Sequence, residues 1–461
     1  MSLPLGLIGY GTVGQGVVDV LERLRGVSAR PEGVPEVRAV LVRNTDRRRD
    51  VPPPAGAVLT DDPDELFASG PAIVAEVAGG LGVEPLLVRA LETGADVVTA
   101  NKALLAERGP ELFARAESCG RRIAIEAAVA GGIPIIAALT EGLAADRPRA
   151  IAGVLNGTCT YILSRLAEDR DGPVGYHEAL AEAQRLGYAE ADPTLDVSGA
   201  DAAQKLAILS TLAFGRVARA EEIPCTGVDG VEPRDARFAR QFGCAVRLVA
   251  TARAPATADG PAHLSVAPTL VPADDPLARV AGSFNAAAIF SEAAGLTYLT
   301  GHGAGRYPTA SAVASDIVTT ARRRLLAGDE RARGTSRASG AEGRRGAAVN
   351  PWPVGAAPLA LAPGDPGRPA RFYVRLHLLH HDMGYAALRA RLAAEGVPID
   401  RLHETDRAMA LLTGVTSRGA VDRALAGEIA DAIDEPRTLV LPVFEGLDRL
   451  ADDLAPAGGG G

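Results

Sequence analysis

Only two lysines, Lys102 and Lys205, occur in this chain of 461 residues, whereas lysine and arginine together number 48. An arginine guanidinium stays protonated at any working pH, but a lysine ammonium can release its proton when its surroundings favour the neutral amine. The two lysines are therefore candidates for acid–base chemistry. From composition alone, two lysines that survived a drift toward arginine are an equal alternative, so their surroundings must decide.

Lys205 has surroundings suited to proton transfer. It follows Asp201 by four residues in a segment that we expect to be helical over about 199–214, so the two side chains share one helix face. The apolar residues after Lys205 predict a buried helix, in which a lysine held by an acid can protonate an alkoxide. The alternatives are that Asp201 completes a capping box with Ser198, or that an exposed ion pair contributes only about 0.3–0.5 kcal/mol.

A strand, a glycine-rich turn and a helix at the start of the chain predict a dinucleotide site. Residues 5–14 read LGLIGYGTVG, and a helical pattern continues to about Leu24. Gly9 permits the tight turn, Gly11 lets the backbone approach a pyrophosphate, and Gly14 allows the helix to pack closely on the strand. The free N–H groups of the helix would hold the phosphates.

Strand-like and helical runs alternate through the N-terminal third, which predicts an α/β fold with a parallel sheet. The strand-like runs after the first are 37–42, 72–77, 96–99 and 122–127. The second of the five strands ends in Arg43, not in an acid that would hold a ribose 2′-hydroxyl. Arg43 can pair with a 2′-phosphate and favours NADP, or use of both cofactors, over NAD alone. A solvated loop arginine is the alternative.

Two more candidates follow predicted strands, at the sheet edge where open α/β folds bind ligands. Lys102 comes after the strand at 96–99, where an ordinary solvated lysine is the alternative. Glu126 precedes the Gly131-Gly132 turn, whose backbone carbonyls can converge with the carboxylate on a hard monovalent cation. A simple turn explains the same residues.

Composition excludes several classes of protein. The formal charge of −9 argues against general binding to nucleic acid or acidic membranes, and no apolar run approaches the roughly 20 residues of a membrane span. The first residues lack the basic stretch of a secretory signal, and the four cysteines show no Cys-x-x-Cys spacing. We therefore expect a cytoplasmic protein with reduced thiols and neither nucleic-acid nor membrane partners.

Taken together, these motifs resemble the homoserine dehydrogenase family over roughly residues 3–325. The shared segments are 9–14, 101–102, 126–134, 156–158, 187–194, 196–205 and 301–313. The block from 187 to 205 is the most specific, because many dehydrogenases share the glycine pattern. The resemblance implies interconversion of L-aspartate 4-semialdehyde and L-homoserine with NADP or NAD, on the route to threonine and methionine. Thr160 departs from the family's Asn-Gly-Thr-x-Asn motif, which unsettles local hydrogen bonding but not the acid–base set.

The resemblance also implies a role for each candidate residue. Lys205 would be the acid–base, Asp201 would orient it, and Lys102 would lie beside it at the nicotinamide end. Glu190 and Asp196 would bind the substrate's amino group, which suits two carboxylates. The implied cofactor contacts are Gly9, Gly11, Thr12, Val13, Gly14, Arg43, Lys102 and Gly303. The implied sodium ligands are Glu126 and the carbonyls of Val129, Gly131 and Ile133.

The expected organisation has three domains. They are an NAD(P)-binding Rossmann domain at 1–130, completed by a returning helix at about 306–326, an α+β catalytic and dimerisation domain at 131–305, and a ferredoxin-like domain at 371–446. A partly disordered linker at 327–370 and a disordered tail at 447–461 complete the chain. Strands expected at 245–252, 263–268 and 287–291 favour a paired-sheet homodimer, or a homotetramer built from it.

The C-terminal domain resembles an ACT domain, which implies an amino-acid effector such as threonine. The family's Asp-x-Pro-Gly loop is replaced by residues 381–384, His-Asp-Met-Gly, so a purely structural domain is an equal alternative. His377, His380 and His381 suggest a metal site, but alternation along a strand favours a surface explanation.

Two other functions compete with homoserine dehydrogenase. Another NAD(P)-dependent enzyme of amino-acid metabolism, such as an aspartate-semialdehyde-type dehydrogenase, would need an activated cysteine, and no cysteine stands beside a histidine. A non-catalytic sensor of nucleotide and amino acid would give no reason for Lys102, Asp201 and Lys205. Homoserine-dependent reduction of NAD(P) separates the three hypotheses.

Overall fold

A computed structural model describes residues 2–27, 33–168, 174–332, 350–362, 369–377, 385–405, 408–426 and 438–447. The chain divides into two compact units. The first contains Met1–Ala145, Ala207–Ala220 and Gly301–Leu359, and the second contains Asp146–Leu206, Glu221–Thr300 and Ala360–Gly461. No helix within the described ranges has both the length and the apolar character needed to cross a membrane.

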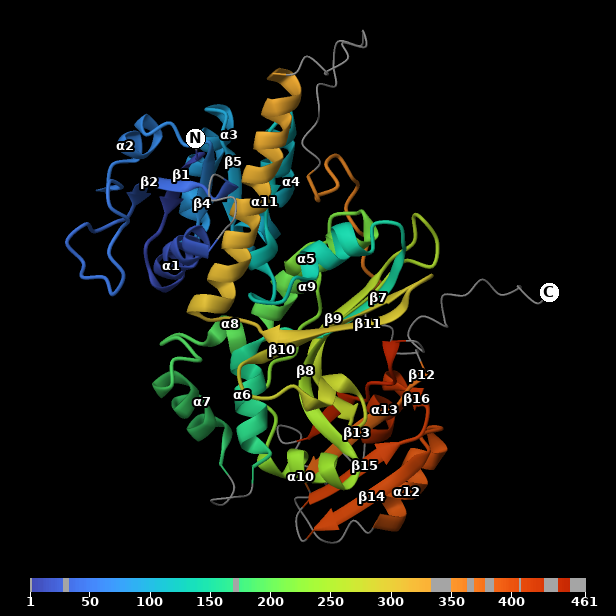
Figure 1. Cartoon of the computed structure of the whole chain (residues 1–461). Coiled ribbons are helices and arrows are strands. Elements are labelled where there is room, and N and C mark those ends of the chain that lie inside the picture. Colours follow the sequence, from blue (N-terminus) through green and yellow to red (C-terminus); the bar gives the residue numbers. More distant parts are fainter. Residues whose placement is uncertain are drawn as a thin grey trace. The chain divides into compact units, whose positions relative to one another are not determined.

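The first unit is built on a parallel sheet with the strand order β3-β2-β1-β4-β5-β6 (Figure 1). Its strands are β1 Pro4–Ile8, β2 Glu36–Leu41, β3 Val58–Thr60, β4 Ile73–Glu76, β5 Asp96–Thr99 and β6 Ile123–Ala124. Its principal helices are α1 Thr12–Val27, α2 Pro63–Ala68, α3 Glu84–Glu92, α4 Lys102–Ser118 and α11 Arg306–Ala332. This order is that of a Rossmann fold, so the predicted α/β class is confirmed.

The returning helix α11 packs against α1, and both helices share one apolar core with β1. The contact is close because Gly16 of α1 lies against α11, where an added Cβ would stand 2.9 Å from the carbonyl oxygen of Arg306. A helix that begins at Arg306, far beyond the last strand of the sheet at Ala124, therefore packs on one face of this sheet.

The strands of this unit differ from the expected ones at two places. The short strand β3 was not expected, and the strand expected at 122–127 is only Ile123–Ala124. That strand stops early because the N–H of Glu126 donates to Asp316 Oδ2 of α11 and the chain enters a 3-10 turn at Glu126–Ala128. A side chain nearly 200 residues away thus ends the strand.

The second unit contains an antiparallel sheet with the order β11-β10-β7-β8-β9. Its strands are β7 Pro148–Val154, β8 Cys244–Arg253, β9 His263–Pro272, β10 Phe284–Ser291 and β11 Gly295–His302. The helices that accompany it are α6 Gly157–Leu166, α7 Tyr176–Arg185, α8 Thr194–Val197, α9 Ala200–Phe214 and α10 Pro233–Gln241. The α6 helix starts directly after β7, which brings the 156–158 turn to the end of a central strand.

A four-stranded antiparallel sheet with the order β14-β15-β13-β17 lies toward the C-terminus. Its elements are β13 Phe372–His377, α12 Tyr385–Ala394, β14 Ile399–Thr405, β15 Ala408–Thr413, α13 Arg418–Leu425 and β17 Leu439–Pro442. The order is ferredoxin-like, as predicted. One face forms a core with α12 and α13, while Tyr373 and Arg375 on the other face bind Asp235 of α10.

Several predictions concern residues outside the described ranges. His380, His381 and the rest of the 381–384 loop are among them, as are most of the expected linker and residues 448–461 of the expected tail.

Candidate active site

The ammonium of Lys205 is held by two acceptors from different parts of the second unit. Its Nζ donates to Asp201 Oδ2 at 2.7 Å and to the carbonyl oxygen of Leu155 at 2.7 Å. The side chains of Lys205 and Asp201 are 12% and 9% exposed, so the alternative of an exposed ion pair is wrong. An ammonium has three N–H bonds, and two are bound within the described part of the chain. The third N–H makes no bond that these contacts account for.

Asn156 connects this pair to a second carboxylate. Its Oδ1 accepts the N–H of Cys159 and caps α6, while its Nδ2 donates to Asp196 Oδ1 and to Asp201 Oδ2, both at 2.8 Å. The hydroxyl of Thr158 donates to Asp196 Oδ2 at 3.1 Å. The structure therefore brings together the predicted residues Lys205, Asp201 and Asp196. Sequence reasoning noted the Asn156 turn but assigned it no role.

The other predicted substrate residue, Glu190, lies apart from these bonds. Its side chain is exposed, and its backbone carbonyl accepts a bond from Gln184. Thr160, the departure from the family motif, donates its hydroxyl to the backbone carbonyl of Asn156 at 2.8 Å. Local hydrogen bonding is therefore satisfied without the expected asparagine.

The cysteine nearest to these carboxylates has the wrong properties for a nucleophile. Cys159 is buried and its Sγ donates to the backbone carbonyl of Asp196 at 3.2 Å. Burial raises the pKa of this thiol well above its ordinary value, and Asp196 and Asp201 raise it further. The thiolate is thus disfavoured, which counts against the competing reaction through a cysteine.

The glycine-rich turn has the geometry that the sequence predicted. Gly9 has φ +97°, and a Cβ on Gly14 would stand 2.3 Å from the carbonyl oxygen of Gly9. A Cβ on Gly11 would meet nothing within 4 Å, so the space beside it is open to a ligand. Helix α1 begins at Thr12 and includes Val13, which places its free N–H groups at this opening.

A buried acid that sequence reasoning missed organises the neighbouring loop. Glu76, at the end of β4, is fully buried and accepts the N–H groups of Ala78 and Gly79 and the hydroxyl of Thr99 at 2.6–2.8 Å. Asn101 caps α4 and donates its Nδ2 to the carbonyl of Gly80 at 2.7 Å. The sequence did contain a signal for this role, because Glu76 ends an apolar strand and stands shortly before Gly79 and Gly80.

The remaining cofactor candidates occupy different surroundings in the first unit. Arg43 is exposed after β2. Gly303 is buried, and its carbonyl oxygen would stand 2.5 Å from a Cβ on Gly131. Lys102 is the first residue of α4, just after β5. The structure therefore joins the Gly303 turn to the Gly131 turn, whereas Lys102 and Lys205 belong to different units.

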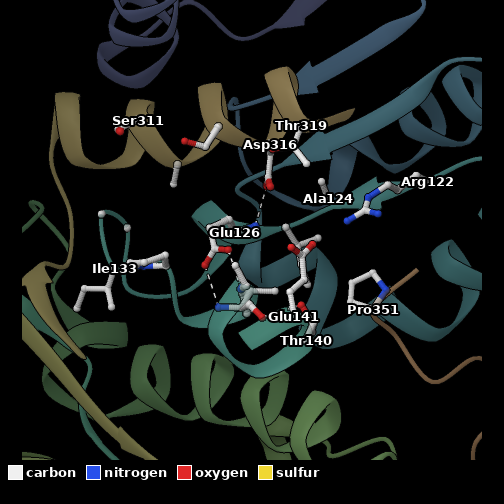
Figure 2. A pocket seen from close by; sticks show the side chains of 18 residues that line it. Arg122, Ala124, Glu126, Ile133, Thr140, Glu141, Ser311, Asp316, Thr319 and Pro351 are labelled. Atoms are coloured by element: carbon white, nitrogen blue, oxygen red, sulfur yellow. Dashed lines mark hydrogen bonds between the residues drawn. The ribbon is translucent and has the colours of Figure 1, made fainter. Parts of the chain in front are cut away.

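Of the cation candidates, Glu126, Gly131 and Ile133 line a cavity of about 330 Å³ in the first unit (Figure 2). Both oxygens of Glu126 accept backbone N–H groups, from Ile136 and Ala137 at 2.8 Å. Figure 2 shows Asp316 reaching from α11 toward Glu126. Burial raises the pKa of Glu126 above its ordinary value and that of Asp316 to about 7.

The chain around Val129 and Ile133 turns sharply. Ala130 has φ +54° and Gly131 has φ +47°, so two successive residues are left-handed. Across the described ranges, His, Cys, Asp and Glu side chains form no group of three that could hold a metal ion. A cation here would therefore depend on backbone carbonyls in addition to Glu126.

Comparison with protein families gives two matches that together cover most of the first 318 residues. Residues 9–126 match the family model described as the NAD binding domain of homoserine dehydrogenase. Residues 134–318 match the model described as homoserine dehydrogenase.

Individual relatives extend the match to the whole chain. A homoserine dehydrogenase of Mycobacterium bovis is 39% identical over 462 residues, covering 97% of each chain. The crystal structure of a homoserine dehydrogenase from Thiobacillus denitrificans superposes with a TM-score of 0.83 at 35% identity, covering 96% of this chain and 98% of that one. A hyperthermophilic archaeal homoserine dehydrogenase in complex with NADPH has a TM-score of 0.58 at 28% identity, covering 70% and 98%.

Proposed function

The chain belongs to the homoserine dehydrogenase family, and from this membership we propose how its residues carry out the reaction. The enzyme interconverts L-aspartate 4-semialdehyde and L-homoserine with an NAD(P) cofactor. The observation that carries the proposal is the ammonium of Lys205, which Asp201 and Leu155 hold with one N–H left for a ligand.

Lys205 protonates the aldehyde oxygen in the reducing direction. The hydride that adds to C4 of the semialdehyde comes from the nicotinamide when NAD(P)H is bound. As the C=O bond opens, its oxygen takes a proton from Lys205 Nζ, which becomes a neutral amine and regains a proton from solvent. In the oxidising direction the neutral amine takes the hydroxyl proton of homoserine. Asp201 orients Nζ and stabilises its charged form.

Asp196 and Glu190 bind the substrate's ammonium group through their carboxylates. The bonds from Asn156 and Thr158 to Asp196 support this role, because they hold its carboxylate next to Asp201. The exposure of Glu190 suits a residue that meets a ligand. Lys102 acts at the nicotinamide end, which its position at the carboxyl end of β5 supports.

The cofactor contacts are those of the glycine turn, Gly303, Lys102 and Arg43, and we propose that NADP is accepted. Arg43 is exposed and lies in a loop outside the strands and helices, and its guanidinium suits a 2′-phosphate. Titration of the full chain with NADPH and with NADH tests this preference. Arg43→Ala should weaken NADPH binding about tenfold and leave NADH binding unchanged.

A monovalent cation such as sodium fits Glu126 with the carbonyls of Val129, Gly131 and Ile133. The buried carboxylate and the left-handed turn at Ala130 support this site, because strained backbone tends to persist where function needs it. When bound, the cation would stabilise the turn that contacts Gly303. Replacing sodium by choline should lower the melting temperature of the wild type but not that of Glu126→Gln.

Assembly and regulation complete the proposal. The strand β11 is a sheet edge with an exposed Leu296, which supports pairing with a second copy in a homodimer or homotetramer. The ferredoxin-like order of the C-terminal sheet supports an ACT-like domain that binds an amino-acid effector.

The free cysteines, Cys119, Cys159, Cys225 and Cys244, support a cytoplasmic enzyme. A light-scattering mass and a titration with threonine test the first two proposals.

The acid–base assignment is tested by Lys205→Arg. An arginine keeps the positive charge but cannot give up its proton, so turnover of homoserine should disappear while NADPH still binds. Kinetics in both directions, with cofactor binding as the control, measure this. A variant with near-wild-type kcat would show that another group moves the proton.

A further inference from the structure

Each of the two oxygens that hold Lys205 is shared with an asparagine. The carbonyl oxygen of Leu155 accepts Lys205 Nζ at 2.7 Å and Asn285 Nδ2 at 2.9 Å. Asp201 Oδ2 accepts Lys205 Nζ at 2.7 Å and Asn156 Nδ2 at 2.8 Å. Each oxygen that accepts a bond from the ammonium therefore also accepts a second hydrogen bond from an asparagine amide.

Asn285 is an unusual residue for its position on β10. Its side chain is 1% exposed, yet its Oδ1 is buried without a hydrogen-bond partner among the described residues. Because the carbonyl of Leu155 can only accept, the NH₂ group must face it and the orientation of the amide is defined. A buried carbonyl that lacks a donor is destabilising, so folding stability alone gives no reason for an amide here.

Asn156 is fixed more completely. Its side chain is 3% exposed, both N–H bonds of its amide reach carboxylates, and its Oδ1 caps α6. The amide cannot rotate without losing these bonds. Its partial positive charge therefore stays next to Asp201 Oδ2.

We propose that Asn156 and Asn285 form an amide clamp that positions Lys205 and weakens the hold of Asp201 and Leu155 on its protons. An oxygen that already accepts one N–H binds a second less strongly, and the positive end of an amide dipole beside an ammonium disfavours the charged form. The clamp thus makes the neutral amine easier to reach, and it fixes the direction of the third N–H. This inference rests on the acid–base role proposed above for Lys205.

The hydrogen bonds of the site bring Asp201, Asp196 and Cys159 near Lys205. Asp201 lies on the same helix, and Asp196 faces it from α8 through Asn156. Cys159 on α6 remains a thiol because burial raises its pKa well above its ordinary value. Asn285 donates to the Leu155 carbonyl and not to a carboxylate, so a changed pH dependence of an Asn285 variant can be assigned to the clamp. An Asn156 variant also loses bonds to Asp196 and Asp201 and serves as the supporting measurement.

The test compares Asn285→Ala and Asn156→Ser in the full-length enzyme. Serine is a good helix N-cap, so Asn156→Ser keeps the cap of α6 and removes the amide donors to Asp196 and Asp201. Homoserine oxidation needs the neutral amine, so we expect the pH midpoint of kcat to rise by about one unit in each variant. Below the midpoint, the same shift appears as a kcat about tenfold lower than that of the wild type. KM for the cofactor should not change.

Two serines on the same elements as the asparagines provide matched controls. Ser291 lies on β10 and is 1% exposed, and Ser164 lies on α6, where its hydroxyl donates to the carbonyl of Thr160. Ser291→Ala and Ser164→Ala should keep the wild-type midpoint. Melting temperatures of all four variants identify any that fail to fold, and if Asn285→Ala does, Asn285→Ser and Asn156→Ser decide the question.

The outcomes separate the clamp from the proposed function. If Lys205→Arg is inactive but the asparagine variants keep the wild-type midpoint, or lose kcat equally at every pH, the clamp is wrong and the acid–base role stands. If Lys205→Arg remains active, the acid–base role itself is wrong.

Discussion

Two ion pairs in the second unit each join a basic side chain to an aspartate, but they differ in burial and in the number of other hydrogen bonds. Lys205–Asp201 is 12% and 9% exposed, and Arg375–Asp235 is 2% and 0% exposed. Asp235 also accepts the hydroxyl of Tyr373 at 2.6 Å and the N–H of Glu232 at 2.7 Å, while Arg375 also contacts Glu232 and Gly230.

The comparison shows how the pair proposed to transfer a proton differs from a pair that joins two elements. The pair at Arg375 uses a cation that cannot lose its proton, and it joins the C-terminal sheet to α10 through many bonds. The pair at Lys205 uses a cation that can lose its proton and keeps one N–H available. The first arrangement suits fixing a domain in place, and the second suits proton transfer.

The largest expected difference is in activity. Lys205→Met should lower kcat by about 10²–10⁴-fold, the range expected when a general acid–base is lost. Its melting temperature should fall less than that of Arg375→Met, because Asp201 keeps its bond from Asn156. Steady-state kinetics and thermal denaturation measure both. Equal activity losses in the two variants would contradict the contrast.

The next largest effect is on stability. Arg375→Met leaves Asp235 buried without its cation and should lower the free energy of unfolding by about 3–5 kcal/mol. Adding Asp235→Asn should restore most of that loss, since no charge is then buried. Chemical denaturation of the single and double variants measures this. A double variant as unstable as the single one would show that packing, not charge, sets the cost.

A smaller effect concerns the pH dependence of stability. Burial raises the pKa of Asp235 from 3.8 to about 6, outweighing the lowering by Arg375 and Tyr373. The folded state therefore binds this proton more tightly than the unfolded state, and the resulting stabilisation is full below about pH 4 and lost as the pH rises through about 6. Between pH 7 and pH 5, the wild type should gain stability relative to Asp235→Asn. An unchanged difference in denaturation midpoint would contradict this sign.

The smallest effect provides the baseline for both pairs. Arg418 and Asp422 form an exposed pair on α13, with side chains 47% and 51% exposed. Arg418→Ala should change the free energy of unfolding by less than about 0.5 kcal/mol and leave kcat unchanged. A larger change in denaturation would mean that burial is not what distinguishes the first two pairs.

Local patterns predicted the elements of the fold well. The strand at 96–99 has the expected bounds, and the sheet order of the C-terminal region is ferredoxin-like, as expected. Alternation of apolar and polar residues depends on neighbours in the chain, so it can be read without knowing the fold. The early end of β6 could not be read in this way, because Asp316 from a distant helix causes it.

The same division applies to the active site. The sequence alone determined the pairing of Lys205 with Asp201, since a spacing of four residues on a helix brings side chains together in any fold. Only the tertiary structure decided which oxygens and amides surround the ammonium. Leu155 stands 50 positions from Lys205 and accepts a bond from its ammonium. Asn285, 80 positions from Lys205, donates to the same Leu155 carbonyl because β7 pairs with β10. Strand pairing has no local signature, so the partners of the Leu155 carbonyl become visible only in the folded structure.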